Sequence, residues 1–387
     1  MQKNIKDLNG NRKYKKQNNL YLLKNINIPG LLVEVGFLSN ANERYMLQTK
    51  DYQDKVVKSL YKGIVEYLNG WYNRNGDNMK SKIFRTIDEQ IEILESRGLI
   101  VEDEDRAREI LLRENYFFVN GYRHLFMQST KEEKYLDGTT FYELHAVFNF
   151  DRRIRNIFFK NILVIENNIK SVMSYQLSKK YGFKDRDYLN PKNFNQDPLK
   201  TRQVKDVLNK MKRQIRVNGT KHSATLHYIN NYGYIPLWIL VKVLSLGIVS
   251  ELYGILTEED ETAICKYFNV DPETMKIYLS ILANYRNLCA HEDILYSNRT
   301  QRMIPDNNIH EKLNIEKIEE EYVYGKNDLF AVIIMMKELL TKSDFSDFIN
   351  EIIYEMEILE NKITTLSKEE LLNKIGFPLN WEEIKDI

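Results

Sequence analysis

Residues 151–177 read DRRIRNIFFKNILVIENNIKSVMSYQL, and this stretch decides the fold. Apolar side chains recur in it every three or four residues, at Ile154, Phe158, Ile162, Ile165, Ile169 and Val172. That spacing places them on one stripe of an α-helix and leaves the charged side chains on the other faces. Because the stretch contains no proline or glycine, it predicts one long helix over 151–177.

Helical signals continue on both sides of this stretch. Thr86 is followed three residues later by Glu89, a capping box that predicts a helix ending near Arg97 and Gly98. Ser367 and Glu370 repeat the box, for a short helix that stops at 376–378 (GFP). Apolar spacing predicts further helices over 236–256, 271–288, 328–340 and 345–365. The chain beyond residue 80 is therefore predicted to be mainly α.

The composition is that of an ordinary globular protein. Hydrophobic residues make up 43% of the 387 positions and charged residues 29%, which is too apolar for a disordered chain. The formal net charge is +1, so a site for a polyanion must be a local patch. Cys265 and Cys289 form no CxxC pair, which argues against a disulfide scaffold and against a thiolate zinc site.

The sequence also bears on location. The first 24 residues are polar and basic, without the apolar segment of a signal peptide. The most membrane-like stretch, 235–256, is interrupted by Lys242 and Glu251, so we expect a buried core helix instead of a membrane span. The expected location is the cytoplasm, with no membrane partner.

The first 72 residues follow a different pattern. An apolar run over 31–37 follows Pro29 and Gly30 and predicts a buried strand. Residues 51–68 carry apolar side chains at helical spacing, and a polar, glycine-containing stretch over 69–78 predicts a linker. We expect a small α/β fragment over 1–72, a linker over 73–79 and a helical domain over 80–387.

Residues 29–68 resemble the C-terminal end of zinc-dependent N-acetylmuramoyl-L-alanine amidases. The match lies in PGLLVEVGFLSN at 29–40, then in Glu43, 52–53 (YQ) and 63–64 (GI). The resemblance implies that Glu34 corresponds to the catalytic acid/base of that family. Such a site also needs metal ligands, typically two histidines and a carboxylate, yet the first of the six histidines is His124. We therefore expect a truncated remnant without amidase activity.

Separated pieces of residues 80–387 resemble, in the same order, the Abi family of bacterial abortive-infection proteins. The pieces are Phe84, 88–90 (DEQ), 94–99 (LESRGL), 111–126 (LLRENYFFVNGYRHLF), 150–151 (FD), Arg155, 165–166 (IE), 236–238 (PLW), Gly247, 286–291 (RNLCAH), 376–378 (GFP) and Trp381. The resemblance implies a helical protein that acts in antiphage defence or as a toxin.

The segment 286–291 is also similar to the Arg-x4-His motif of HEPN ribonucleases, a helical superfamily of RNA-cleaving toxins and defence proteins. Metal-free RNA cleavage moves a proton from the 2′-hydroxyl and another to the leaving 5′-oxygen, and histidine is suited to both transfers. The resemblance implies that His291 is the general acid/base, Arg286 the phosphate and transition-state stabiliser and Asn287 a positioning group. This chemistry needs no metal or other cofactor. RNA is the expected partner, with an antitoxin or a regulatory RNA as a further candidate.

The spacing of this motif has a geometric consequence. Five residues on a regular helix turn through roughly 140°, so Arg286 and His291 do not share a face, whereas Asn287 and His291 do. A single motif is therefore an awkward site, unless the helix ends near Ala290 or Arg286 reaches round it. The other Arg-x4–6-His spacing in residues 80–387, from Arg216 to His222, stands in a sequence context that is not comparable. HEPN proteins join two motifs across a dimer. A homodimer is therefore implied, with Arg286, Asn287 and His291 of both chains facing a shared cleft.

Each of these residues also has a structural interpretation. His291 can be a helix-terminal histidine with local hydrogen bonds, Arg286 an ion-pair partner of Glu166, and Asn287 a cap residue. Glu166 can orient Arg286 or His291, or it can be a surface charge. Cys289 is expected to be a packed hydrophobic residue and not a nucleophile.

Two further features bear on RNA binding. The basic stretch 200–221 (KTRQVKDVLNKMKRQIRVNGTK) is a candidate RNA-contact patch, and the alternative is a solvated helix face. Its candidate contact residues are Lys205, Lys210, Lys212, Arg213 and Arg216. The rings of Tyr116 and Tyr122 can stack on bases, but we expect them to pack within a helix–turn segment.

The sequence therefore favours a metal-independent endoribonuclease of the abortive-infection type. One alternative is a non-catalytic RNA-binding module built from the same helices. Another is a cell-wall amidase, which rests on the N-terminal fragment alone.

Overall fold

The computed structural model describes residues 39–75, 84–129 and 133–387. The chain divides into two compact units, Met1–Phe84 and Arg85–Ile387. Within the described residues the fold is mainly α, as predicted, and the strands form two small antiparallel hairpins. The first hairpin pairs β1 (Met127–Ser129) with β2 (Lys134–Tyr135), and the second pairs β3 (Lys317–Ile318) with β4 (Glu321–Tyr322).

The first unit contains two helices among its described residues, α3 (Ala41–Gln48) and α4 (Lys50–Asn75). The helix predicted over 51–68 is confirmed, but α4 continues to Asn75 and includes part of the expected linker. Each internal glycine, such as Gly70, costs a helix only about 1 kcal/mol relative to alanine, which is too little to end it. The strand predicted over 31–37 lies outside the described residues, and so does Glu34.

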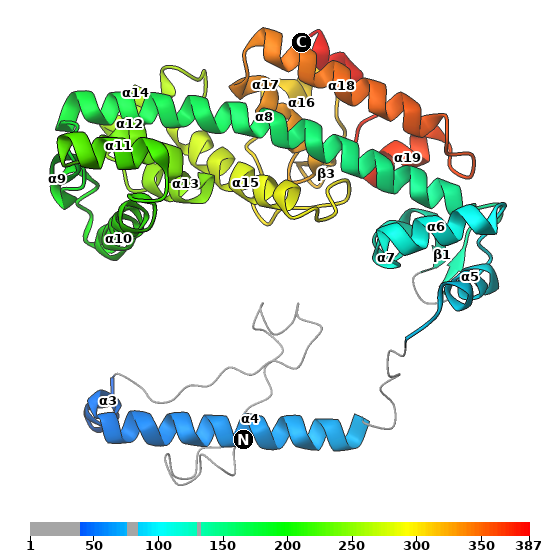
Figure 1. Cartoon of the computed structure of the whole chain (residues 1–387), viewed down its shortest axis with the longest axis horizontal. Helices are drawn as coiled ribbons and strands as arrows, with labels where there is room; N and C mark the ends of the chain where they lie inside the picture. The colour runs from blue at the N-terminus through cyan, green and yellow to red at the C-terminus, as the bar shows by residue number, and fades with distance from the viewer. Residues whose placement is uncertain (1–38, 76–83, 130–132) are drawn as a thin grey trace. The chain divides into compact units, whose positions relative to one another are not determined.

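The second unit begins with short elements that gather at the N-terminal end of the long helix α8 (Figure 1). They are α5 (Ile87–Ser96), α6 (Glu104–Glu114), α7 (Phe117–Tyr122), a 3₁₀ helix (Arg123–Phe126), β1 and β2. The predicted capping box is present, because the side chains of Thr86 and Glu89 each accept the other residue's backbone N–H. Gly98 follows α5 with φ +89°, a conformation that favours glycine.

Helix α8 (Phe141–Tyr181) contains the stretch that decides the fold. It begins ten residues before the predicted start because Thr140 and Glu143 form another capping box upstream. The predicted stripe is confirmed, since its first five members are buried and Val172 is partly buried. The helix ends before Gly182, which has φ +94°.

The elements after α8 are mostly short. They are α9 (Asp185–Tyr188), 3₁₀ helices at Pro191–Asn193 and Pro198–Lys200, α10 (Thr201–Asn218), α11 (Ser223–Tyr232), α12 (Leu237–Leu240), a 3₁₀ helix at Val241–Val243, α13 (Leu246–Tyr253) and α14 (Glu258–Cys265).

The single helix predicted over 236–256 is wrong, because the backbone is extended at Leu244 and Ser245 and separates α12 from α13. Ser245 caps α13 through the backbone N–H of Ile248. The freed carbonyl of Leu244 accepts a hydrogen bond from the Lys170 ammonium of α8 at 2.6 Å. The Ser245 cap and the Lys170 ammonium therefore replace the helical hydrogen bonds that the apolar spacing predicted at this point.

The C-terminal part follows the predictions more closely. Its helices are α15 (Pro272–Ala290), α16 (Asn308–Lys312), α17 (Leu329–Leu339), α18 (Lys342–Glu360), α19 (Lys368–Ile375) and a 3₁₀ helix at Trp381–Lys385. The helices predicted over 271–288 and 328–340 and the capping box of Ser367 are confirmed. Helix α18 begins three residues before the predicted 345 because Thr341 caps it, and it ends five residues early at Glu360.

The core of the second unit surrounds α8, which packs against α18 on one side and against α15 on another (Figure 1). Helix α17 is buried almost all round, as the uninterrupted apolar run over its first eight residues, 329–336, requires. Among the described residues, no helix combines the length and the apolar character that a membrane span needs.

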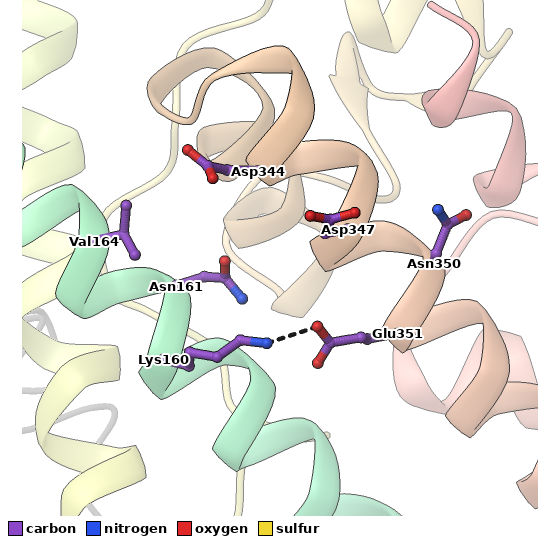
Figure 2. A pocket seen from close by; sticks show the side chains of 7 residues that line it. All are labelled: Lys160, Asn161, Val164, Asp344, Asp347, Asn350 and Glu351. Atoms are coloured by element: carbon purple, nitrogen blue, oxygen red, sulfur yellow. Dashed lines mark hydrogen bonds and ion pairs between the residues drawn. The ribbon is translucent and has the colours of Figure 1, made fainter.

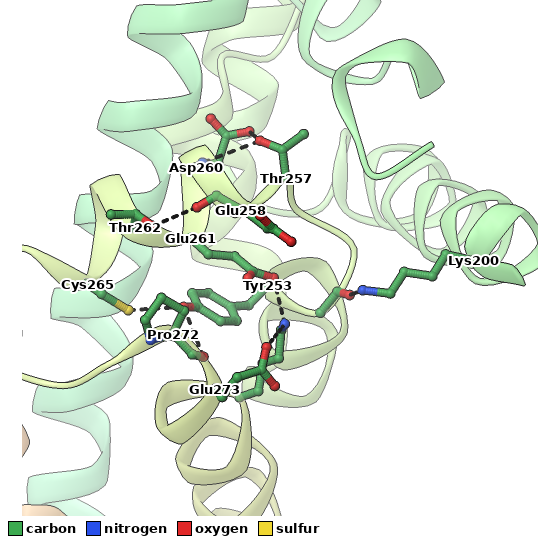
Figure 3. Close-up of polar contacts among 12 residues, drawn as sticks. Lys200, Tyr253, Thr257, Glu258, Asp260, Glu261, Thr262, Cys265, Pro272 and Glu273 are labelled. Carbon is green, nitrogen blue, oxygen red and sulfur yellow. Dashed lines mark hydrogen bonds and ion pairs between the residues drawn. The ribbon is translucent and has the colours of Figure 1, made fainter. Parts of the chain in front are cut away.

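The start of α15 is fixed by polar contacts with α13 and α14 (Figure 3). The Tyr253 hydroxyl lies 3.4 Å from the carbonyl oxygen of Pro272, the first residue of α15, and 3.0 Å from Cys265 Sγ on α14. Burial raises the pKa of the Tyr253 hydroxyl and of the Cys265 thiol. Lys276 on α15 pairs with the buried Glu261 at 3.0 Å. These contacts hold the helix that carries residues 286–291 at its other end.

Candidate functional site

The predicted motif lies at the C-terminal end of α15. Asp271 caps the start of this helix, and Ala290 is its last residue. His291 is the C-cap, with φ −101° and ψ 5°, and its backbone N–H donates to the carbonyl oxygen of Asn287 at 3.0 Å. The helix therefore stops within the motif.

The turn that follows has the hydrogen bond of a Schellman motif. The N–H of Asp293 donates to the carbonyl oxygen of Leu288 at 3.1 Å, a bond that closes the helix end. Glu292 occupies the left-handed position with φ +57°, where helices favour glycine. A non-glycine residue in this conformation places backbone strain directly after His291.

Arg286 is held against the middle of α8. Its Nε lies 3.7 Å from Oε2 of Glu166, and its guanidinium carbon lies 5.5 Å from the centre of the Phe159 ring. Glu166 is only 6% exposed, so it is a buried partner of Arg286 and not a surface charge. Lys170 completes the group, because its ammonium binds both Glu166 and the carbonyl oxygen of Leu244.

Asn287 and His291 are exposed, and neither side chain makes a hydrogen bond or ion pair within the described part of the chain. The side-chain cap role considered for Asn287 is therefore absent. Because the helix is regular up to Ala290, Arg286 and His291 still leave its axis about 140° apart. The described residues contain no contact between these two side chains.

The chain after the turn is anchored by a buried carboxylate on α8. Asp151 accepts hydrogen bonds from the backbone N–H of Tyr296 at 2.7 Å and of Leu295 at 3.2 Å. It also accepts from the Tyr122 hydroxyl at 2.7 Å and from the Arg155 guanidinium at 2.5 Å. Burial raises the pKa of Asp151, and these donors oppose that shift by stabilising the charged form.

Two more contacts fix the same segment. Arg155 donates to the carbonyl oxygen of Asp293 at 2.9 Å, two residues after His291. The ring of Tyr122 stacks on that of Tyr296 with centroids 5.5 Å apart. Tyr122 is buried, which confirms the packing interpretation and leaves no ring face for a base.

From the sequence, Asp151 and Arg155 are only pieces of the resemblance and Tyr122 is expected to pack, so the role of these three residues at the turn is not predicted. The available signal was polar residues at helix positions where the apolar stripe predicts burial. Such residues need partners from elsewhere in the fold.

Cys289, inside the motif, is a packed residue, as predicted. It is buried, and burial raises the pKa of its thiol to about 12. A thiol with that pKa holds almost no thiolate at neutral pH, so it is a poor nucleophile.

The basic stretch forms α10, which has one apolar side and one charged side. Val204, Val207, Leu208 and Met211 are buried. All five candidate contact residues are exposed, but Lys210 is paired with Glu251 at 2.6 Å. Lys205, Lys212, Arg213 and Arg216 make no ion pair with any described residue.

A pocket lies between α8 and α18, away from the motif (Figure 2). It is lined by Lys160, Asn161, Val164, Asp344, Asp347, Asn350 and Glu351. Lys160 and Glu351 form an ion pair across it at 2.6 Å. Within the described ranges, no three His, Cys, Asp or Glu side chains are grouped to hold a metal ion.

Comparison with known proteins agrees with the pieces quoted above. The Abi-like protein family matches this chain over residues 109–297, a range that contains Asp151, Glu166 and the whole of 286–291. Residues 109–297 are thus similar to Abi-like proteins. The matched range is shorter than the range 80–387 over which the resemblance was expected. The quoted pieces before residue 109 and after residue 297 lie outside the match.

The N-terminal resemblance is also confirmed. The N-acetylmuramoyl-L-alanine amidase family matches residues 1–66. The germination-specific N-acetylmuramoyl-L-alanine amidase of Bacillus subtilis (strain 168) is 50% identical over 60 residues, which are 16% of this chain and 25% of that protein. A putative N-acetylmuramoyl-L-alanine amidase of Buchnera aphidicola subsp. Acyrthosiphon pisum (strain APS) is 40% identical over 58 residues, 15% of this chain and 24% of that protein. The chain thus spans about a quarter of the length of these relatives. No solved structure matches the chain.

Proposed function

We propose that this Abi-like chain is a metal-independent endoribonuclease of the HEPN type, acting in antiphage defence or as a toxin. One observation carries the proposal. Residues 286–291 place an exposed His291 and Asn287 at a fixed helix end, beside an Arg286 that the buried Glu166 holds. A reactive group needs a rigid support and an open approach, and this helix end has both.

The chemistry assigns a role to each side chain. His291 removes the proton of an RNA 2′-hydroxyl, whose oxygen then forms a bond to phosphorus while the bond from phosphorus to the 5′-oxygen breaks. The leaving oxygen gains a proton, and the products are a 2′,3′-cyclic phosphate and a 5′-hydroxyl. Arg286 stabilises the charge on the phosphoryl oxygens, and Asn287 positions the phosphate.

The geometry of the motif supports a homodimer in this proposal. Because Arg286 and His291 leave α15 about 140° apart, one chain does not direct both at the same phosphate. A two-fold axis near the end of α15 brings Arg286 of one subunit opposite His291 of the other. RNA is the substrate in this proposal, and an antitoxin or regulatory RNA is the partner that restrains it.

The first experiment measures RNA cleavage by the full chain in EDTA. Wild type is expected to cleave and to leave 2′,3′-cyclic phosphate ends. His291→Ala should lose about 10²- to 10⁴-fold in rate, the usual contribution of a general acid/base. Arg286→Ala should lose about 10²- to 10³-fold. The control is His124→Ala, since His124 is exposed and lies outside the motif.

A mixing experiment tests the composite site. Arg286→Ala and His291→Ala chains, unfolded and refolded together, form heterodimers in which one of the two sites is intact. About a quarter of the wild-type activity should return if each site takes residues from both subunits. If wild type cleaves RNA but the mixture recovers no activity, the nuclease proposal stands and the proposal of a site shared between subunits is wrong.

The rival function is RNA binding without cleavage. It is favoured by the His291 ring, which has no described carboxylate or carbonyl partner to orient it as a base. Tight RNA binding that His291→Ala leaves unchanged, with no cleavage by either protein, would establish this alternative.

Amidase activity is not part of the proposal. Residues 1–66 contain no histidine, although they carry the matched Glu34. We expect purified protein to hold less than stoichiometric zinc, which elemental analysis measures. One zinc per chain would reopen the amidase interpretation.

A further inference from the structure

A connected set of aromatic rings lies on elements near the C-terminal end of α8, where α9, α11 and α12 gather (Figure 1). We name this set the aromatic row. Its members, in order of contact, are Trp238, Phe183, Tyr234, Tyr232 and Tyr228. Neighbouring ring centroids are 5.9, 5.7, 6.3 and 5.4 Å apart, with planes tilted by 34° to 54°. Tilted neighbours do not cover one another as stacked rings do.

Three of the five rings in the aromatic row are exposed to solvent, and Tyr228 and Tyr234 are half-buried. Trp238 is 42% exposed, Phe183 41% and Tyr232 57%. The indole N–H and the three tyrosine hydroxyls make no hydrogen bond to any described residue. Large rings with unused polar groups at the surface are typical of an interface that a partner covers.

The surrounding sequence is strongly basic. Residues 179–238 contain thirteen Lys and Arg but four Asp, a net charge of +9 in a chain whose total is +1. The remaining residues therefore carry a net charge of −8. The partner that fits this segment is an anion with flat apolar groups.

Lysine and arginine side chains without an ion-pair partner among the described residues lie in the segments that carry the row and in the neighbouring helix α10. Lys184 follows Phe183 directly, and its ammonium lies 5.4 Å from the centre of the Tyr234 ring. Helix α10 leads into α11, and Thr225 joins the two through a 2.7 Å hydrogen bond to the carbonyl oxygen of Asn218. The four unpaired cations of α10 thus belong to the same basic segment as the aromatic row.

We propose that the aromatic row binds the unpaired bases of single-stranded RNA, while Lys184 and the free cations of α10 bind its phosphates. Base stacking on exposed aromatic side chains, combined with a basic surface, is how single strands are bound with little sequence preference. Duplex RNA does not fit the row, because its base faces are stacked on one another. The inference rests on the proposed function to the extent that the bound strand is the substrate of residues 286–291.

The test measures binding separately from cleavage. It uses the full chain carrying His291→Ala, in EDTA, with fluorescently labelled twelve-nucleotide oligo(U) and oligo(A) RNA and a duplex of the same length. Fluorescence anisotropy gives the Kd. Tyr232→Ala and Trp238→Ala should each weaken single-strand binding by roughly 5- to 100-fold, the range expected for one stacked base. Trp238→Phe keeps a ring and should retain most of the affinity.

The matched control is Tyr354→Ala on α18, which removes a ring that is 61% exposed and lies outside the row. It should leave the Kd unchanged. Replacing Lys212 and Arg213 with alanine should make the affinity less dependent on salt, because each phosphate contact to a single strand contributes about −0.7 to the slope of log K against log salt. Circular dichroism spectra should match among all variants.

The outcomes separate the two proposals. Unchanged binding of oligo(U) and oligo(A) by the Tyr232 and Trp238 variants overturns the aromatic row as an RNA site, even if wild type cleaves RNA. Weakened binding supports the row, even if no cleavage is found. If Tyr232→Ala instead dissociates an oligomer in solution and leaves RNA binding intact, the row is a protein interface and the proposal is wrong.

Discussion

Replacing Asp151 with asparagine tests the anchor that fixes the chain after His291. The substitution keeps the shape but removes the charge. The asparagine oxygen, in the place of Oδ1, still accepts the hydrogen bond from the N–H of Tyr296. The asparagine NH₂ group, in the place of Oδ2, faces the Arg155 guanidinium, and two donors cannot form a hydrogen bond with each other. Removing one partner of a buried ion pair costs about 3–5 kcal/mol, since the other charge stays buried and uncompensated.

We therefore expect Asp151→Asn to lower the free energy of unfolding by about 3–5 kcal/mol, a large part of the total of a typical domain. Urea denaturation of the full chain, followed by far-UV circular dichroism, measures the change. The matched control is Glu351→Gln, which removes the exposed ion pair to Lys160 drawn in Figure 2 and should cost less than about 1 kcal/mol.

A double-mutant cycle isolates the pair. Arg155→Met alone leaves the Asp151 carboxylate buried without its cation and should cost a similar amount. The double variant should be more stable than the sum of the two losses predicts, by at least about 1 kcal/mol, because each single variant leaves an unpaired group that the other change removes. Additive losses, or an Asp151→Asn variant within about 1 kcal/mol of the parent, would refute the anchor.

Four further predictions concern other features of the second unit. Burial raises the pKa of Glu143, but hydrogen bonds from threonine N–H and hydroxyl groups outweigh it and hold that pKa below its ordinary value. The ionised Glu143 therefore stabilises the fold above about pH 4.3, and this stabilisation is lost as the pH falls. Glu143→Gln should lower the free energy of unfolding in urea by roughly 1–3 kcal/mol at pH 7 and by less at pH 3. An equal loss at both pH values would contradict this. Gly121→Ala places a Cβ 2.7 Å from Cδ1 of Ile294 and should lower the melting temperature, whereas in an Ile294→Val background it should be neutral or stabilising, since alanine favours a helix by about 1 kcal/mol. Glu292→Gly should raise the free energy of unfolding by about 0.5–1 kcal/mol because it relieves the left-handed conformation, and a loss of stability would show that Glu292 is not strained. His291→Ala should change that free energy by less than about 0.5 kcal/mol while cleavage is lost, and a larger loss would indicate a structural histidine.

Local signals were sufficient to predict many helix boundaries. Thr86, Thr140 and Ser367 each act through a partner three residues away, so a capping box is visible wherever both residues are read together. The box at Thr140 was nevertheless overlooked, and α8 was predicted ten residues short. At Ser245 the prediction failed in the opposite way. The apolar run around Ser245 predicted one continuous helix, although Ser245 caps a new helix and the preceding one has ended.

Contacts between distant parts of the chain could not be predicted in this way. Asp151 and Tyr296 are separated by 145 positions, and no period or spacing joins them. The same holds for Lys170, which satisfies the carbonyl oxygen of Leu244 after the unpredicted break. Burial of Asp151 was implied by its place on α8, but the identity of its partners depends on how α8 packs against α15.

The pieces of the Abi resemblance within 109–297 differ in what they do. Tyr122, Asp151 and Arg155 bond one another and the chain at 293–296, while Glu166 holds Arg286. The side chains of Asn287 and His291, by contrast, make no hydrogen bond, ion pair or ring contact in the described chain. The scaffold therefore fixes a helix end that carries two exposed polar side chains without a hydrogen-bond or ion-pair partner among the described residues. Because Tyr122, Asp151 and Arg155 stabilise the fold, Asp151→Asn should lower both the free energy of unfolding and the rate of cleavage. Because the His291 side chain is exposed, His291→Ala should lower the rate of cleavage alone.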